Sequence, residues 1–305
     1  MIRKEFDRLV EEKLEILDNS PERFTNEVIK AQVKIWEEIR ENFSKLQTKD
    51  EKVVQNAKNL QIINKIVKQM RIVSSTGDYF QAVQSFLKEF DQTAKISERL
   101  TAVVNKSFNP NAFATQIKAA YRETAVKQLF ANPVSNTETA LRNSLVSSVA
   151  AGATLQQTLQ SAREVIQGGP DTDGRMLANI KTVAATSIAV SDRGYTAVLN
   201  QQVGAEWYAY RGGKIETTRL FCRERNGKYF HRKEIEAWGR GEDAGDVEGI
   251  KEDGTWNGQI EGTTASTIFT FAGGWNCRHS IIMVPISYVP NDVINRNIAN
   301  GNYKP

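Results

Sequence analysis

The sequence predicts an α+β protein, in which a long, mostly α-helical N-terminal two-thirds is followed by a small β-rich, turn-rich C-terminal module. Only two glycines, Gly77 and Gly152, occur in the first 167 residues, whereas the remaining 138 residues hold eighteen. Four of the five tryptophans also lie in the late segment: Trp207, Trp238, Trp256 and Trp275. A long glycine-poor stretch is typical of helices, and a segment rich in glycine and tryptophan is typical of turns and short strands.

The helical prediction rests on apolar residues spaced three and four apart. Ser20-Pro21 combines a capping residue with a proline suited to a first helical turn, so we expect a helix to begin there. Its apolar stripe is Phe24, Val28, Ala31, Ile35, Ile39, Phe43 and Leu46. The next segment has Val53, Ala57, Leu60, Ile63, Val67 and Met70, and the one after has Phe80, Val83, Leu87, Phe90 and Ala94. Gly77 stands between these two segments, where a helix is expected to end.

Pro110 and Pro133 predict two later breaks, with one helix between them. The apolar residues of that helix are Phe113, Ile117, Tyr121 and Leu129. Residues 137–166 and 175–203 predict two further helices, which the glycine- and proline-containing turn 168–171 separates.

From residue 204 onward the pattern is that of strands and turns. Residues 204–213 alternate like a strand that ends in a Gly-Gly turn, and residues 226–230 predict a second strand after a turn. Residues 266–285 contain two apolar, β-branched stretches on either side of a Gly-Gly pair. Residues 239–262 hold seven glycines and a run of acidic residues, so we expect a solvated loop. The polar tail after Pro290 is expected to be extended or docked on a partner.

These features predict four regions. They are a helical region over 1–132, a second helical region over 133–203, a small β-rich Cys/His module over 204–290, and a polar tail over 291–305.

Composition excludes several classes of protein. Two cysteines are too few for a disulfide-stapled secreted scaffold. No run of residues approaches the 18 apolar positions of a transmembrane helix, and the charged N-terminus lacks the apolar core of a signal peptide. We therefore expect a soluble protein, with no membrane partner, that works or is assembled in a cytosol.

The net charge of +4 is unevenly distributed. Residues 51–150 hold 13 basic and 7 acidic side chains, an excess of +6. Candidate contacts for nucleic acid in this stretch are Lys52, Lys58, Lys65, Lys68 and Arg71. Such a surface is suited to nucleic acid or to an acidic partner, and the alternative is an ordinary solvated helix face.

All cysteines and histidines fall in one window of 58 residues: Cys222, His231, Cys277 and His279. Thiolate and imidazole are the ligands that zinc prefers, four at a time in structural sites. We expect Cys222 and His231 to come from one hairpin and Cys277 and His279 from another. Residues two apart in a strand point to the same face, so the latter pair can bind one ion together. The prediction is one structural zinc ion that stabilises a small module.

Three alternatives to zinc stay open. The cysteines can pair as a disulfide, although a reducing compartment disfavours it. They can be small buried hydrophobes, with both histidines incidental. Cys222 can be a nucleophile with a nearby histidine as base, although its surroundings contain no activated-thiol motif. Because the phosphate-binding, dinucleotide-binding and G-x-S-x-G motifs are absent as well, we predict that the chain is not an enzyme and has no catalytic residues.

Two boxes in the late segment resemble the phage Mu F-like head morphogenesis family. The first has Thr218-Arg219, Phe221-Cys222, Gly227-Lys228 and Phe230, similar to the family's Thr-Arg-Pro-Phe-Cys…Gly-Lys-Val-Phe box. The second is Gly273-Gly274-Trp275-Asn276-Cys277-Arg278-His279, followed by Pro285. A preceding helix with Ala184, Ser191, Arg193 and Ala197 also resembles the family. The resemblance covers about residues 137–290.

This resemblance implies a minor capsid protein of a tailed bacteriophage. Such a protein is located in the virion, is assembled in the host cytoplasm, and associates at low copy number with the portal protein at one vertex. Further partners are the major capsid protein, a scaffold protein and packaged DNA, and the roles are head assembly, DNA packaging or DNA ejection. The box cysteines and histidines are then expected to hold the small module together around zinc.

The sequence departs from the family pattern near the first box. Leu220 stands where proline is usual, Glu216 is the nearest candidate for a displaced acidic residue, and Asn226 takes a position that is often histidine. Under this resemblance we therefore expect His231 to substitute as the fourth ligand. Two other functions remain as alternatives: a head-carried enzyme or effector that uses the Cys/His cluster, and a nucleic-acid-binding module that uses the basic helices.

Other box residues have structural roles to fill. We expect Gly227, Gly273 and Gly274 to supply turn conformations closed to other residues. Trp275 and Phe230 are expected in the core of the module. Arg278 is expected on the opposite strand face from its neighbours, paired with a carboxylate such as that of Glu216.

Overall fold

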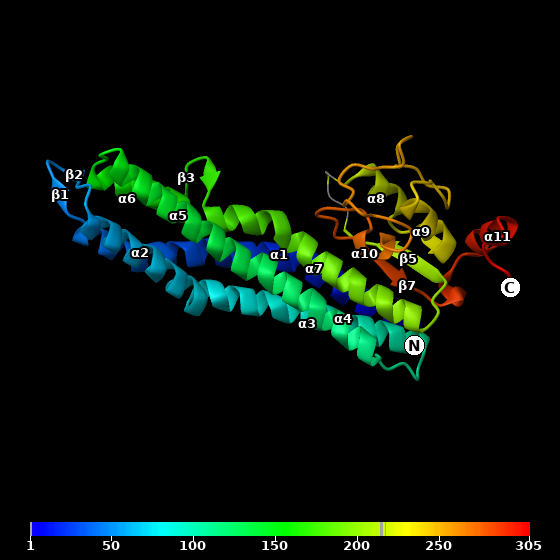
Figure 1. Ribbon diagram of the computed structural model, residues 1–305. Coiled ribbons are helices and arrows are strands. Elements are labelled where there is room, and N and C mark those ends of the chain that lie inside the picture. The colour runs from blue at the N-terminus through cyan, green and yellow to red at the C-terminus, as the bar shows by residue number, and fades with distance from the viewer. Residues whose placement is uncertain (1, 214–215, 217) are drawn as a thin grey trace. The chain divides into compact units, whose positions relative to one another are not determined.

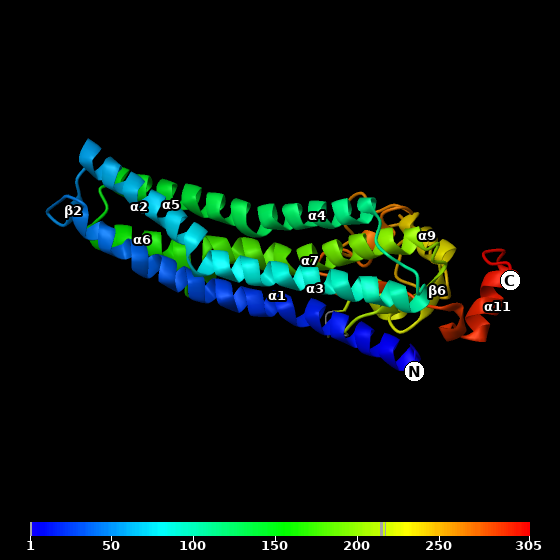
Figure 2. The ribbon, with the colours of Figure 1, turned by 90° about the horizontal axis from the view of Figure 1, so that it is seen from below.

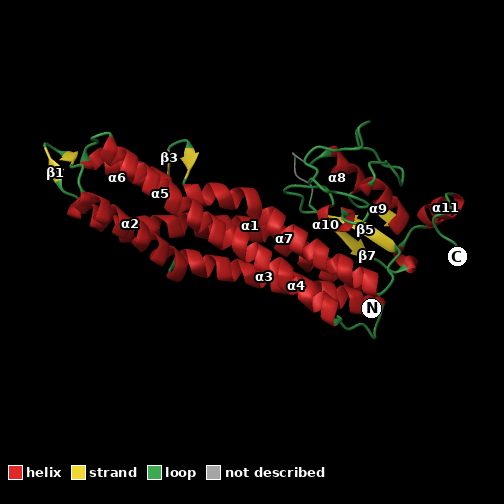
Figure 3. Cartoon of the chain, in the orientation of Figure 1, coloured by secondary structure: helices red, strands yellow, loops and turns green. Residues whose placement is uncertain are grey.

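A computed structural model describes residues 2–213, 216 and 218–305. The chain is 67% helical with a few small antiparallel sheets, which confirms the predicted α+β fold (Figures 1 and 3). It divides into two compact units. The first comprises Met1–Ser20, Glu89–Glu123 and Ala185–Pro305, and the second comprises Pro21–Lys88 and Thr124–Ala184. The four regions expected from the sequence stay a prediction.

The helices of the described chain are α1 (Ile2–Arg40), α2 (Ala57–Thr76), α3 (Asp78–Val104), α4 (Ala112–Val126), α5 (Asn132–Ala150), α6 (Leu155–Gln167), α7 (Arg175–Gln202), α8 (Leu220–Arg225), α9 (Arg232–Gly239), α10 (Ile268–Phe271) and α11 (Asn291–Ala299). Short 3₁₀ segments are Glu41–Lys45 and Ile286–Tyr288, and a π-helical turn spans Lys127–Ala131. The strands are β1 (Thr48–Lys49), β2 (Lys52–Val53), β3 (Gly168–Gly169), β4 (Thr172–Asp173), β5 (Trp207–Arg211), β6 (Tyr229–His231) and β7 (Ser280–Met283).

The first helix does not begin at Ser20-Pro21, as expected, but runs through Pro21. An interior proline costs about 3 kcal/mol because it removes one hydrogen bond and crowds the preceding turn. Burial along the helix outweighs this cost, because an apolar stripe precedes the proline as well as following it. Its buried members are Phe6, Leu9, Leu17, Phe24, Val28, Ala31, Ile35 and Ile39.

The predicted break at Gly77 is confirmed, since α2 ends at Thr76 and α3 begins at Asp78. The predicted break at Pro133 is wrong. Pro133 lies in the first turn of α5, which follows directly on the π-helical turn, so the helix runs through this proline without a break. Phe113, expected on an apolar stripe, is 57% exposed. The helix expected over 137–166 divides near Gly152, which adopts a φ of 68°, into α5 and α6.

In the second unit, α5 packs against both α2 and α6, and Figure 1 shows these three helices side by side. Thr154 caps α6 by accepting a hydrogen bond from the Gln157 N–H, and the Gln157 side-chain oxygen accepts one from the Thr154 N–H. The turn expected at 168–171 is the hairpin β3–β4, which leads into α7.

The first unit contains a three-stranded antiparallel sheet with the order β6-β5-β7. The strands predicted near 204–213 and 226–230 are therefore confirmed as β5 and β6. Of the two stretches predicted around Gly273-Gly274, the second is β7, but the first folds as α10. In β5, Tyr208 pairs with Phe230 and Met283, and Trp207 pairs with His231.

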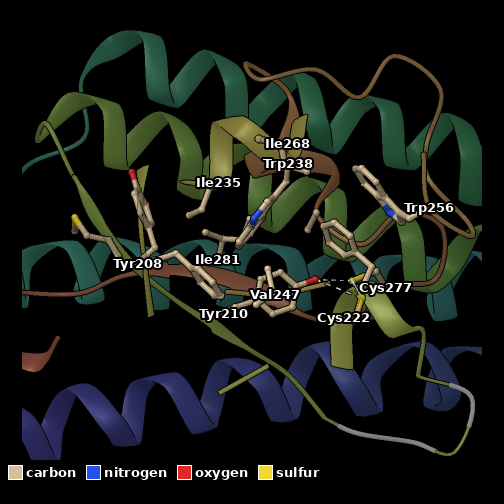
Figure 4. Packing of buried hydrophobic residues seen from close by; sticks show 14 of the residues in the cluster. Tyr208, Tyr210, Cys222, Ile235, Trp238, Val247, Trp256, Ile268, Cys277 and Ile281 are labelled. Carbon is tan, nitrogen blue, oxygen red and sulfur yellow. Dashed lines mark hydrogen bonds between the residues drawn. The ribbon is translucent and has the colours of Figure 1, made fainter. Parts of the chain in front are cut away.

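The two faces of this sheet bury different residues. One face packs on residues from α8, α9, α10 and the loop that follows α9. It contributes Tyr208, Tyr210, Phe230, Ile281 and Met283 to that core (Figure 4). The other face packs on the start of α1, the end of α3 and α11. It contributes Trp207, Ala209 and Ile282, with Tyr229 partly buried beside them. Within this unit α1, α3 and α7 also run alongside one another, as Figure 2 shows.

The loop over 239–262 is irregular, as expected, but it is not simply solvated. Its Val247 and Trp256 are buried in the module core. Arg225 of α8 anchors the acidic run, because its fully buried guanidinium donates to the Glu248 carbonyl (2.7 Å) and to Asp243 Oδ1 (3.0 Å). The same guanidinium lies over the Phe221 ring, 3.8 Å from its centroid.

The tail after Pro290 is not extended, because residues 291–299 form α11. Val293 and Asn297 of this helix are buried, and Arg296 pairs with Glu234 of α9 at 2.9 Å. Among the described residues, no helix is long and apolar enough to cross a membrane.

Candidate metal centre

Cys222, Cys277 and His279 come together in the first unit, on the core face of the three-stranded sheet. One potential ligand atom from each lies within 4.8 Å of the others, and all three residues are buried. The two Sγ atoms are 3.7 Å apart, and Cys277 Sγ is 3.8 Å from His279 Nδ1. Figure 4 shows both sulfur atoms at the edge of the aromatic core, beside the Tyr210 hydroxyl. Three of the four predicted metal ligands therefore share one site.

The elements that carry these residues differ from the predicted hairpins. Cys222 lies on the short helix α8, not on a strand. Cys277 and His279 lie in the irregular segment between α10 and β7. Cys277 and His279 nevertheless share one site, because a single arginine binds the backbone carbonyl oxygens of both residues.

That arginine is Arg193 of α7, which is 2% exposed. Its Nη1 donates to the carbonyl oxygens of Cys277 and His279, each at 2.9 Å, and its Nε donates to Thr270 O at 2.7 Å. The sequence singled out Arg193 only through its family resemblance. The structure gives it a physical role, which is to fix the Cys277-Arg278-His279 backbone against α7.

A glycine is needed at position 273, because the backbone there passes so close to the two sulfur atoms that no side chain fits. A Cβ at this position would lie 2.2 Å from Cys222 Sγ and 2.8 Å from Cys277 Sγ. The expected turn conformation was wrong for Gly273, whose φ is not positive, but is confirmed for Gly227 (φ 88°) and Gly274 (φ 96°).

The two thiols differ in acidity. The hydrogen bond with Cys277 and burial raise the pKa of Cys222. The same hydrogen bond, assisted by His279 and by the positive charge of Arg193, holds the pKa of Cys277 well below its usual range. Of the two thiols, Cys277 is therefore the one that ionises more readily.

The donor set suits zinc, since two sulfurs and an imidazole are preferred zinc ligands. His279 Nδ1 is the ring nitrogen that faces Cys277 Sγ, at 3.8 Å, while its Nε2 is buried and has no hydrogen-bond partner among the described residues. The cysteines are free rather than paired, and their 3.7 Å separation exceeds the S–S bond length of about 2.0 Å.

His231, the fourth predicted ligand, is not at this site. It lies in β6 opposite Trp207, on the other face of the sheet, with its ring centroid 5.0 Å from that of Trp207. Its Nδ1 accepts a hydrogen bond from the Lys233 N–H at 3.2 Å, so its role is to cap α9. Glu234 completes this capping box by accepting from the His231 N–H at 2.8 Å.

His231 gives a pH-dependent prediction. Burial lowers its pKa below the ordinary 6.5, although Glu206, Glu234 and Glu236 oppose the shift. Below about pH 6.5, His231 therefore binds a proton more readily in the unfolded chain than in the folded chain. As the pH is lowered from 6.5, the free energy of unfolding decreases until the pH passes the pKa of His231 in the folded chain. We expect His231→Asn, which keeps a capping acceptor but cannot be protonated, to remove this part of the acid destabilisation. Urea unfolding of the wild type and the variant at several pH values checks this prediction. If the free energy of unfolding changes equally steeply with pH in both proteins below pH 6.5, the prediction is contradicted.

Other box residues were placed partly as expected. Phe230 is buried, but Trp275, expected in the core, is 47% exposed. Arg278 donates to the backbone carbonyl of Asp18 at 2.9 Å rather than to Glu216. Asn226 donates to Gly212 O at 2.9 Å, which joins the end of α8 to the turn after β5.

The predicted nucleic-acid residues lie in the second unit and are all exposed: Lys52, Lys58, Lys65, Lys68 and Arg71. Four of them are on α2, but Lys52 is in the β1–β2 hairpin rather than on the helix. Arg71 lies 3.9 Å from Glu138 of α5, which offsets part of its charge. Contact with nucleic acid stays a prediction.

Sequence reasoning missed Tyr210, which stands beside both sulfurs. Its Oη is 3.4 Å from Cys222 Sγ and 3.8 Å from Cys277 Sγ. Strand alternation was the available signal, because Tyr208 and Tyr210 must share the face opposite Trp207. Burial raises the pKa of the Tyr210 phenol well above its ordinary value.

Comparisons of the chain with family models, with curated proteins and with solved structures give no match.

Proposed function

We propose that this chain is a structural minor capsid protein of a tailed bacteriophage, associated with the portal vertex and assisting head assembly or DNA delivery. One observation carries the proposal. The two boxes that resemble the Mu F-like family, far apart in sequence, meet at one buried cluster through Cys222 and Cys277. The third resembling segment contributes Arg193, which binds the backbone of the second box. All the segments that carry the resemblance thus serve one site.

The proposed role of this cluster is structural. We infer that it binds one zinc ion through Cys222, Cys277 and His279, and that the ion joins α8 to the turn before β7. A module with one small sheet gains stability from such a cross-link, because metal binding adds directly to folding free energy. Zinc supplies no chemistry here beyond holding these residues together.

The test is the protein composition of particles from the phage or prophage that encodes the chain. We expect mass spectrometry of purified virions and procapsids to find the chain at low copy number relative to the major capsid protein, and to find it with the portal protein after capsid disassembly. Absence from both particles would contradict the proposal.

A matched pair of variants links the cluster to incorporation. A Cys222→Ser, Cys277→Ser double variant is expected to be lost from particles because its module unfolds. His231→Asn changes a buried histidine on the other face of the sheet and is expected to be incorporated normally. If the cysteine variant instead folds but loses a catalytic turnover that the wild-type chain shows, the alternative of a head-carried enzyme is favoured.

A further inference from the structure

We propose that Tyr210 is the fourth protein ligand of the zinc centre, in the place that sequence reasoning assigned to His231. This inference rests on the proposed zinc site. It concerns the phenol oxygen of Tyr210, which would close the coordination sphere so that all four ligands are supplied by this chain.

The sheet positions Tyr210 at the cluster. Residues two apart in a strand point to the same face, so Tyr208 and Tyr210 both enter the module core. The ring of Tyr210 stacks on that of His279, with centroids 5.3 Å apart and planes 29° apart. Trp238 packs against it edge-on, with centroids 6.2 Å apart. The ring is thus fixed between two neighbours with its hydroxyl directed at the sulfurs (Figure 4).

The distances between the candidate ligand atoms suit one tetrahedral ion. Ligands at about 2.0–2.3 Å from zinc stand roughly 3.3–3.8 Å from one another. Tyr210 Oη lies 3.4 Å from Cys222 Sγ and 3.8 Å from Cys277 Sγ, and the two sulfurs are 3.7 Å apart. Cys277 Sγ and His279 Nδ1 are 3.8 Å apart. Four of the six separations among the four donor atoms therefore match those around one tetrahedral zinc ion.

The surroundings can balance the charge of this ligand set. Zinc with two thiolates, a neutral imidazole and a phenolate carries one net negative charge. Arg193 Nη1 donates to the carbonyls of Cys277 and His279 at 2.9 Å, and Arg219 Nη1 donates to Gly273 O at 3.5 Å. Their guanidinium groups supply positive charge at the site. On binding, the phenol proton and any remaining thiol proton pass to solvent, and no atom is oxidised or reduced.

The packing leaves one side of the cluster closed by backbone. A Cβ on Gly273 would lie 3.2 Å from Tyr210 Oη, as well as within 3 Å of both sulfurs. Gly273 therefore packs directly against three of the four donor atoms, where any side chain would displace them. His231 cannot take part, because Trp207, its partner in the pairing of β5 and β6, lies on the opposite face from Tyr210.

The test compares the whole chain with three single variants. Tyr210→Phe removes the proposed ligand atom. Tyr208→Phe is the matched control, because it removes a hydroxyl from the same strand and the same core but one that donates to Ala205 O at 3.0 Å. His231→Asn tests the residue that the sequence favoured. Zinc content per chain, affinity by competition with a chromophoric chelator, and the ultraviolet difference band of ionised tyrosine on addition of zinc are measured for each.

We expect one zinc per wild-type chain and a tyrosinate band on binding. Tyr210→Phe is expected to lose the band and to bind zinc at least about tenfold more weakly, whereas both controls match the wild type. Zinc binding by the wild type without the band would overturn the role of Tyr210, even if Tyr210→Phe fails to fold. Weaker binding by His231→Asn would also overturn it. A wild-type chain that takes up no stoichiometric zinc would instead contradict the zinc site itself, which is a separate failure.

Discussion

Replacing Lys13 with methionine is expected to lower the free energy of unfolding by about 3–5 kcal/mol, because it leaves a buried carboxylate without its partner. Lys13 Nζ lies 3.0 Å from Asp192 Oδ1, and the two side chains are 1% and 0% exposed. The ammonium also donates to Ser97 Oγ at 2.9 Å and to Thr196 Oγ1 at 3.1 Å. These contacts join α1, α3 and α7 inside the first unit.

The double variant Lys13→Met, Asp192→Leu is the control. Burying two ions is itself costly, so replacing both by apolar side chains of similar size is expected to recover most of the stability lost in either single variant. Urea unfolding followed by circular dichroism measures all four proteins. If the loss of stability in the double variant equals the sum of the losses in the two single variants, Lys13 and Asp192 have no interaction energy and the prediction is contradicted.

Replacing Arg193 with methionine is expected to have an effect of similar size, about 3–5 kcal/mol. Three carbonyl oxygens, those of Thr270, Cys277 and His279, lose a charged donor at once, and each such bond contributes about 1.5–3 kcal/mol before partial compensation. The variant is also expected to bind zinc more weakly, because the backbone that presents Cys277 and His279 is no longer fixed.

Arg278→Met is the matched control for this second change. Arg278 lies between Cys277 and His279 in the chain, but among the described residues its side chain donates to a single carbonyl oxygen, that of Asp18. We expect this variant to lose about 1.5 kcal/mol, because a single part-buried bond is removed, and to keep zinc affinity close to that of the wild type. Equal losses of stability for the two arginine variants would show that Arg193 has no special role at the cluster.

The fold class and several elements could be predicted because they depend on local patterns. The apolar stripe from Phe24 to Leu46 is buried throughout, and Gly77 separates α2 from α3 as expected. The errors arise where tertiary packing overrides a local signal. Pro21 reads as a helix start, yet the helix continues through it because the stripe is already buried before it.

The candidate site could be predicted in part. The crowding of all cysteines and histidines in one part of the chain was enough to predict Cys222, Cys277 and His279 as candidate ligands, because thiolate and imidazole are the side chains that zinc prefers. His231 was assigned wrongly because the sequence does not state which face of the sheet a residue occupies until the register of β5 and β6 is known. Tyr210 was missed because a tyrosine in an alternating strand reads as core.

The buried charges could not be predicted. Lys13 sits in an N-terminal segment rich in charged residues and reads as solvated, and Asp192 reads as an ordinary polar position of a helix. Only the packing of α1 against α7 places one against the other. Arg225 is a similar case, because its partners Asp243 and Glu248 lie in a loop whose acidic composition suggests full exposure.

Anomalous scattering at the zinc edge, from crystals of the wild-type chain, will show whether one metal ion joins the two boxes. We predict a single strong peak at about 2.0–2.3 Å from Cys222 Sγ, Cys277 Sγ, a ring nitrogen of His279 and Tyr210 Oη. A peak beside His231, or continuous density between the two sulfurs with no peak at all, would contradict this prediction.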